Sequence, residues 1–392
     1  MATSAVFFSN GAVLAIWATN IPGMKQALQL TDAELGMALS AFAAGTMLMM
    51  CLAGALVTRI GSRRAVLLGG SLVAMVLPLC GLATSAWTLA GAIFALGLAN
   101  SILDVAMNTH GSLVEAHKGR PLMSSFHALF SIGGLAGASA VATLLSSHLG
   151  LVQCLLLSAG FTALVTLIAA PWLGDLRPCA PGVPGRPARS FAWPNRALLC
   201  IAGLTFLALF IERTVIDWSS LYLTEVSQAP ATLAAFAFGA FSFAMALGRL
   251  AGDALIRRCG PDRVLTLSAA VGALGVALIL LVPLPGTAIL GFVLIGLGLS
   301  NMTPLLYSQA SRAFPGAPGL GLAMNGTLGY TGFLLAPPVI GLLSGTFGLQ
   351  LALLVPLAAF VVLMASHWRK VRGQRLAPGG LFNPVTGSTA AP

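Results

Sequence analysis

Charged residues are scarce in this chain of 392 residues. Asp, Glu, Lys and Arg together make up 8% of it, whereas soluble domains carry about 25%. Acidic residues are the rarest, with ten Asp and Glu against 20 Lys and Arg, so the formal net charge is +10. Hydrophobic residues make up 57% of the sequence, and the mean hydropathy is +0.94. This composition excludes a soluble protein and indicates one that is embedded in a lipid bilayer.

Motifs for catalysis and for metal binding are also missing. The six cysteines stand singly, with no CxxC and no Cys/His ligand spacing, so we expect neither disulfides nor a metal site. There is no Walker loop, no HExxH and no GxSxG. We therefore expect a protein that is not an enzyme and that needs no cofactor. The first apolar run lacks a basic n-region and a cleavage site, which predicts a first membrane span and not a signal peptide.

Apolar runs of roughly 20 residues, enough to cross about 30 Å of hydrocarbon, recur along the whole sequence. They predict an all-α polytopic membrane protein with twelve spans, at 3–22, 33–57, 65–85, 87–111, 123–146, 151–173, 197–220, 231–256, 263–283, 286–309, 318–345 and 348–367. Basic residues follow the even-numbered spans and also fill the Pro/Gly-rich segment 174–196 and the C-terminal tail, with Lys25 as the exception. Because loops rich in Lys and Arg stay in the cytoplasm, we predict that both termini and segment 174–196 are cytoplasmic. This pattern sets membrane orientation and argues against a nucleic-acid partner.

The two halves of the chain resemble each other at a nearly constant offset of about 198 residues. The matching positions are Gly54 with Gly252, Arg59 with Arg257, Gly134 with Gly332, and Gly97 with Gly296 after a slip of one residue. The repeat predicts a six-helix bundle at 1–173, a cytoplasmic linker at 174–196, a second six-helix bundle at 197–368 and a cytoplasmic tail at 369–392.

The fourth span carries a polar stripe. Asn100, Asp104 and Asn108 are spaced i, i+4, i+8, which places them on one helical face. An ionisable residue facing lipid costs on the order of 3 kcal/mol or more, so Asp104 is expected to face a cavity or a partner. It can exchange a proton there, or it can be a structural carboxylate that binds the two amides. His127, early on the fifth span, is a candidate relay to Asp104 or a packing residue.

The seventh span holds three charged residues. Arg213 and Asp217 are i, i+4 neighbours, so they predict a structural ion pair. Glu212 lies on a different face and has no basic residue three or four positions away, so it must be protonated or face water or substrate. We interpret Asp104 and Glu212 as the carboxylates for proton coupling or substrate binding. The span directions place Asp104 in the cytoplasmic third and Glu212 on the external side of the midplane.

Five further residues are weaker candidates for substrate binding or proton coupling. Each has a polar or aromatic side chain on a span that can face the interior: Trp17, Asn20, Trp218, Asn301 and Tyr307. Asn301 and Tyr307 occupy the repeat position of the polar stripe, with Thr303 in place of Asp104. The tryptophans also fit the aromatic belt of a membrane interface. Glycine pairs spaced four apart, at 133/137, 248/252 and 341/345, predict close helix packing inside a monomer.

The segment after the second span carries a resemblance to a known family. It reads Gly54-Ala-Leu-Val-Thr58-Arg59-Ile-Gly61-Ser-Arg63-Arg64, and its repeat reads Gly252-Asp253-Ala-Leu-Ile256-Arg257-Arg258-Cys-Gly260. With twelve spans in two parallel halves, the whole chain resembles the major facilitator superfamily. The resemblance implies two pseudo-symmetric six-helix bundles that transport a small molecule by alternating access around a site on spans 1, 4, 7 and 10. It adds Asn325 and Tyr330 as site candidates.

In this family the motif forms a cytoplasmic gate, whose residues here are Arg59, Arg63, Arg64, Arg249, Asp253 and Arg257. Thr58 replaces the family's acid, which leaves the usual Asp–Arg latch in question unless Asp253 or Arg249 substitutes.

Two further stretches, Asp104-Val-Ala-Met-Asn108 and Gly119-Arg-Pro-Leu-Met followed by Phe126-His127, resemble a bacterial inner-membrane branch related to fucose permease. That likeness implies a small polar, sugar-like solute. We expect a monomeric transporter that Asp104 and Glu212 couple to protons. Proton-driven efflux of amphipathic compounds is the alternative. A transporter-like receptor that binds a ligand without moving it is the alternative from another class.

Overall fold

The computed structural model describes residues 1–118, 122–147, 149–174, 195–313 and 318–376. Every regular element in these ranges is a helix. Among the described residues, twelve helical segments are long and apolar enough to cross a membrane, which confirms the predicted all-α membrane fold and the number of spans. Most of the predicted linker and most of the predicted tail lie outside the described residues.

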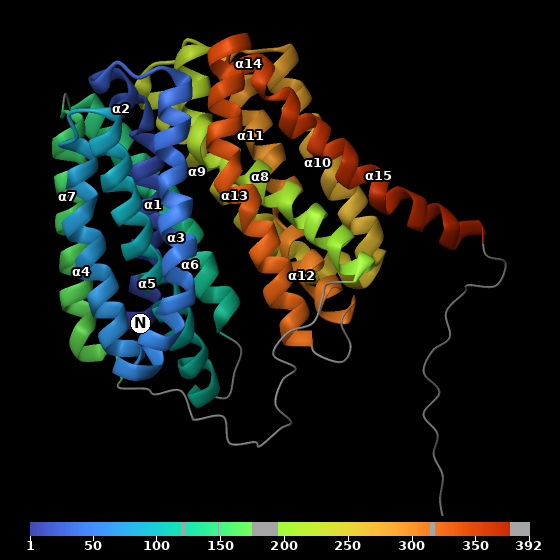
Figure 1. Ribbon diagram of the computed structural model, residues 1–392, viewed down its shortest axis with the longest axis horizontal. Helices are drawn as coiled ribbons and strands as arrows, with labels where there is room; N and C mark the ends of the chain where they lie inside the picture. Colours follow the sequence, from blue (N-terminus) through green and yellow to red (C-terminus); the bar gives the residue numbers. More distant parts are fainter. Residues whose placement is uncertain (119–121, 148, 175–194, 314–317, 377–392) are drawn as a thin grey trace, which may run out of the picture.

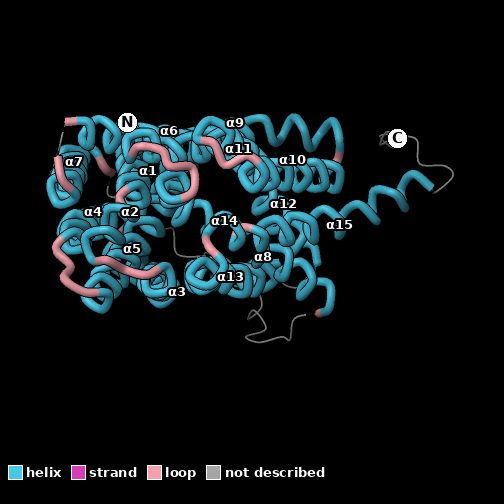
Figure 2. The backbone as a smooth tube through the Cα atoms, turned by 90° about the horizontal axis from the view of Figure 1, so that it is seen from above, coloured by secondary structure: helices cyan, strands magenta, loops and turns pink. Residues whose placement is uncertain are grey.

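The chain forms two groups of helices that stand side by side (Figures 1 and 2). The first group contains α1 (Ala2–Thr19), α2 (Ile21–Leu28), α3 (Asp32–Ile60), α4 (Ser62–Gly81), α5 (Ala86–Lys118), α6 (Met123–Ser146), α7 (Leu151–Ala169) and the short 3₁₀ helix Ala170–Trp172. The second group contains α8 (Arg196–Glu225), α9 (Ala231–Cys259), α10 (Pro261–Leu281), α11 (Pro285–Leu299), α12 (Met302–Ala313), α13 (Pro318–Phe347), α14 (Leu349–Ala352) and α15 (Leu354–Leu376).

Several spans differ in detail from the prediction. The first span breaks at Asn20 and continues as α2 to Leu28, and the tenth breaks at Ser300 and Asn301 between α11 and α12. The last helix runs to Leu376, past the predicted end of the second bundle. At the first break the Asn20 side chain bonds the carbonyl of Ile16, 2.8 Å away. A side chain that takes up a free carbonyl in this way stabilises a helix end.

The two halves repeat the same close helix contacts. A Cβ added at Gly133 would lie 2.0 Å from the carbonyl oxygen of Phe8, and one at Gly332 would lie 2.3 Å from that of Phe206. The position equivalent to Gly332 is therefore Gly133 and not Gly134, which instead faces Ser242 of the other half. The sequence match was wrong by one residue because both glycines fit the offset and only one of them touches the neighbouring backbone.

The junction between the second and third spans is also repeated. Gly61 joins α3 to α4 with φ +85°, and Gly260 joins α9 to α10 with φ +80°. A residue with a Cβ is strained in this region of φ, so the repeated glycines permit both sharp junctions.

The two bundles meet mainly through two helix pairs, α3 with α13 and α6 with α9. Near the upper end in Figure 1, a Cβ at Gly36 of α3 would lie 2.3 Å from the carbonyl of Pro337 in α13, and one at Gly341 would lie 2.4 Å from that of Asp32. Below these contacts the ribbons of the two bundles diverge toward the lower end in Figure 1. The bundles are thus joined at the upper end.

Candidate functional site

An ionic cluster ties the two bundles together at the upper end. Lys25, at the end of α2, pairs with Asp32 of the same bundle and, at 2.5 Å, with Glu225 at the end of α8 in the other bundle. Asp32 also accepts a hydrogen bond from Ser344 of α13. We call these four residues the upper latch. In the sequence, Lys25 stood out only as the exception to the loop-charge pattern. Asp32 is near it in the chain, but Glu225 and Ser344 are not.

About 18 Å below Glu225 along α8 lies a second contact between the bundles, the Arg213 cluster. Arg213 Nε is 2.7 Å from Asp217 Oδ2, so the structure contains the ion pair expected from the sequence. The guanidinium carbon also lies 5.3 Å, 4.9 Å and 5.3 Å from the ring centres of Trp17, Phe42 and Phe333. These distances fit cation–π contacts. Because Trp17 and Phe42 belong to the first bundle, Arg213 holds both bundles together.

The Arg213 cluster is buried, and only some of its polar atoms have a hydrogen-bond partner. Arg213 and Asp217 are buried, and Arg213 Nη2, Asp217 Oδ1 and the indole nitrogen of Trp17 have no hydrogen-bond partner in the structure. Trp17 stacks on Phe42 with ring centres 5.3 Å apart. Trp17 therefore packs in this layer and does not lie in an aromatic belt.

Polar and ionisable side chains gather below the Arg213 cluster, and they come from both bundles. Asn108 donates to Asp104 at 3.2 Å, and neither side chain is fully buried. Tyr330 of α13 lies within electrostatic range of Asp104 in the first bundle and of Glu212 and Tyr307 in the second. The Tyr307 hydroxyl faces Gly326 of α13. The structure thus brings Asp104, Glu212, Tyr307 and Tyr330 to one region, which we call the polar layer.

The sequence placed Asp104 and Glu212 at different depths with no need for contact. Helix geometry puts Asp104 about 27 Å below the start of α5 and Glu212 about 20 Å below the end of α8. The difference in depth is small enough that Tyr330 lies within electrostatic range of both Asp104 and Glu212. Tyr330 therefore lies between the two bundles, within electrostatic range of both carboxylates.

Arg249 is the charged neighbour of Glu212 that the sequence did not identify. It lies on α9, where it interacts electrostatically with Glu212 and with His127 of α6. Its Nε donates a long hydrogen bond of 3.4 Å to the Ser300 carbonyl. Arg249 therefore lies beside the polar layer, and its role in the cytoplasmic gate stays a prediction.

His127 does not bind Asp104. Its ring meets Phe7 edge-on at 5.4 Å, and among the described residues the side-chain partner of Asp104 is Asn108. The contact with Phe7 fits the packing role that the sequence also allowed, and the relay to Asp104 stays a prediction. The two residues lie on different helices, and His127 turns toward α1 and α9.

The remaining amide candidates take part in helix packing. Asn301 Nδ2 donates to the Gly248 carbonyl at 2.9 Å, where α9 contacts the break between α11 and α12. Asn325 Oδ1 accepts from Thr205 at 3.1 Å. Asn100 is buried, and its Oδ1 has no partner. Trp218 is buried, which places it away from a membrane interface.

The motif arginines lie at the lower end. Arg63 Nε donates to the Ala170 carbonyl at 3.1 Å, a contact inside the first bundle that caps the end of the sixth span. Arg59, Arg64 and Arg257 are exposed, and none of them forms an ion pair with a described residue. The side chain of Asp253 lies outside the described residues. This end of the molecule carries no latch of the kind found at the upper end within the described part of the chain.

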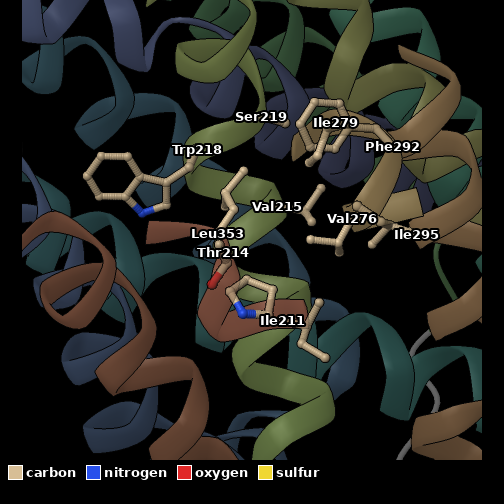
Figure 3. Close-up of a pocket in the computed structure, with 11 residues that line it drawn as sticks. Ile211, Thr214, Val215, Trp218, Ser219, Val276, Ile279, Phe292, Ile295 and Leu353 are labelled. Carbon is tan, nitrogen blue, oxygen red and sulfur yellow. The ribbon is translucent and has the colours of Figure 1, made fainter. Parts of the chain in front are cut away.

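Two cavities lie away from the polar layer. One, inside the second bundle, leaves about 10 Å³ between apolar side chains, and Figure 3 shows Val215, Val276, Phe292 and Ile295 around it, with the indole of Trp218 extending away. This is room for about one water molecule. The other, of about 850 Å³, lies at the upper end beside Lys25 and Glu225 and is also lined by Asn20.

Comparison with known proteins agrees with this architecture. The model of the Major Facilitator Superfamily matches residues 3–315 and 201–378. An uncharacterized MFS-type transporter of Yersinia pestis is 34% identical over 365 residues, covering 92% of this chain and 94% of the relative. The membrane protein MosC of Rhizobium meliloti is 32% identical over 373 residues, covering 91% and 86%.

Solved structures share the fold at low identity. A mutant of the nucleoside transporter NupG superposes with a TM-score of 0.79 at 16% identity, covering 94% of this chain and 98% of that one. A bacterial homologue of the human lysosomal transporter Spinster, in an inward-facing and unoccupied conformation, gives 0.76 at 14% identity, covering 95% and 96%. The chain belongs to the Major Facilitator Superfamily of secondary transporters.

Proposed function

We propose that this protein is a monomeric, proton-coupled transporter that moves a small, sugar-like solute across a bacterial inner membrane. The upper end in Figure 1 would be external and the lower end, with both termini, cytoplasmic. The exposed arginines of the lower end, among them Arg59, Arg64 and Arg257, support this orientation. In this orientation the described conformation is closed to the outside by the upper latch.

The observation that carries the proposal is that each bundle holds a carboxyl group within a membrane span, Asp104 on α5 and Glu212 on α8, and that both lie within electrostatic range of Tyr330. A carboxyl group that is shielded from water in one state and wet in another changes its proton affinity as the bundles rock. Protonation and solute binding then bias the same equilibrium, because both act on residues that line the interface between the bundles. Arg249 adds a fixed positive charge that attracts the Glu212 carboxylate.

The chemistry of the polar layer supports a hydroxylated solute. Carboxylates and Asn108 accept or donate hydrogen bonds to hydroxyl groups, and tyrosines do both. The likeness of the Asp104–Asn108 stretch to the fucose permease branch points the same way, and NupG, with the same fold, is a nucleoside transporter. Efflux of amphipathic compounds would be favoured by an apolar site, which the residues of this layer do not make.

The test is solute-driven proton movement in proteoliposomes that contain a pH-sensitive dye. Neutral sugars, sugar acids and amphipathic cations are compared for the wild type, Asp104→Asn and Glu212→Gln. Glu34→Gln is the matched control, since the exposed Glu34 side chain caps its own helix at the upper end, far from the polar layer. We expect a solute-dependent pH change that one or both interior variants lose and the control keeps.

Other outcomes contradict parts of the proposal. Solute movement without a pH change in any protein would overturn proton coupling and leave uniport. Proton exchange driven only by amphipathic cations would establish efflux. Binding without movement of any solute would establish a receptor.

A further inference from the structure

Two basic side chains from opposite bundles lie at the same level. Helices α6 and α9 pack antiparallel, and a Cβ at Gly134 of α6 would lie 3.5 Å from Ser242 of α9. Seven residues below each of these positions are His127 on α6 and Arg249 on α9. Seven residues are two helical turns, so both side chains lie about 10 Å below the Gly134–Ser242 contact and on the same helix faces.

Neither residue forms an ion pair with a described side chain. Arg249 is exposed although it lies within a membrane span, and its hydrogen-bond partner among the described residues is the Ser300 carbonyl at 3.4 Å. His127 is exposed and touches the Phe7 ring. Within the described side chains, which exclude Asp253, no carboxylate lies within 4.0 Å of either group. An unpaired guanidinium inside a span faces water or a ligand.

We propose that Arg249 and His127 bind the carboxylate of the transported solute, and that this solute is a hydroxylated monocarboxylic acid of the sugar-acid class. This inference rests on the proposed transport function and makes its substrate more specific. The guanidinium fork matches a carboxylate with two parallel hydrogen bonds, and a His ring nitrogen donates a third. The hydroxyl groups of the acid then face the polar layer.

Glu212 and Asp104 limit the charge of the ligand. Glu212 lies within electrostatic range of Arg249, and Asp104 and Glu212 both lie within electrostatic range of Tyr330. A phosphorylated sugar would bring about two negative charges next to these carboxylates, and like charges at short range repel. A single carboxylate balances Arg249 without this repulsion. The site is also divided between the bundles, so a bound acid draws α6 and α9 together.

The test uses the purified full-length protein in detergent and measures the midpoint of thermal unfolding. Gluconate and glucuronate are compared with glucose, and sodium chloride matches the ionic strength. We expect both acids to raise the midpoint and glucose to leave it unchanged at the same concentration. Arg249→Gln should weaken the affinity for the acids about tenfold or more, and His127→Asn should weaken it less.

Controls separate binding from folding. Arg258→Gln removes an exposed arginine of the same helix at its lower end and should keep the acid response. Arg249→Lys keeps the charge without the fork and should recover part of the response. Because each variant is compared with and without acid, a change in intrinsic stability does not imitate a loss of binding.

Three outcomes overturn the subsite. In the first, neither acid raises the unfolding midpoint of the wild type. In the second, glucose raises it as much as the acids do, and Arg249→Gln keeps this effect. In the third, glucose 6-phosphate raises it more than the acids do. Proton-coupled movement of neutral sugars alone would overturn the subsite and leave the proposed function standing. Movement of the acids without a pH change would overturn the proposed proton coupling and leave the subsite standing.

Discussion

The ion pair between Lys25 and Glu225 predicts how far one substitution shifts the conformational equilibrium. Opening of the upper end must separate these residues, because they belong to different bundles. The pair between Lys25 and Asp32 lies inside one bundle and persists in both states. Glu225→Gln therefore removes one contact that exists only when the upper end is closed.

The expected shift follows from the exposure of the pair. The Lys25 and Glu225 side chains are 16% and 39% exposed, and ion pairs near water contribute about 0.2–1 kcal/mol. Glu225→Gln should thus raise the ratio of upper-open to upper-closed molecules about 1.4- to 5-fold. Lys25→Gln should give at least this shift, because it also leaves Asp32 and Glu225 as like charges across the interface, and the double variant should shift no more than either single one.

The assay is the distance between two spin labels on opposite bundles at the upper end. Cysteines replace the exposed residues Thr84 and Leu284 in a protein whose six native cysteines have been substituted. The fraction of long distances should rise in Glu225→Gln and stay unchanged in Glu34→Gln. Equal distance distributions for Glu225→Gln and Glu34→Gln, or additive shifts of the two latch variants, would refute the latch.

Three other predictions concern packing and buried charge, and each is measured by thermal unfolding in detergent. Gly332→Ala would place a Cβ 2.3 Å from a backbone carbonyl of α8 and should cost about 1–3 kcal/mol, whereas Gly203→Ala, with open space around it, should change stability by less than about 0.5 kcal/mol. Arg213→Met leaves Asp217 buried and unpaired and should cost about 3–5 kcal/mol, and adding Asp217→Leu should restore most of that loss. Asn301→Ala removes its bond to the α9 backbone and should cost about 1 kcal/mol. Equal stability of the two glycine variants, a double variant weaker than Arg213→Met, or an unchanged Asn301→Ala would contradict the respective arguments.

The sequence by itself determined the features that arise within one helix. The twelve spans follow from hydropathy, since an apolar run of about 20 residues has few other stable places than a bilayer. The Arg213–Asp217 pair and the contact of Asn108 with Asp104 follow from i, i+4 spacing, which the helix itself converts into proximity. The breaks at Asn20 and Asn301 were not predicted, because both segments are apolar enough to read as continuous helices.

Only the tertiary structure decided which helices face each other and therefore which charges meet. Lys25 and Glu225 are 200 residues apart, and no local pattern links them. Arg249 reads as part of the lower loop motif from its position near Asp253, and only the packing of α9 against α11 shows that its side chain reaches the Ser300 carbonyl. Neighbours across a bundle interface depend on helix register and rotation, and these are set by close backbone contacts at particular glycines, which hydropathy does not encode.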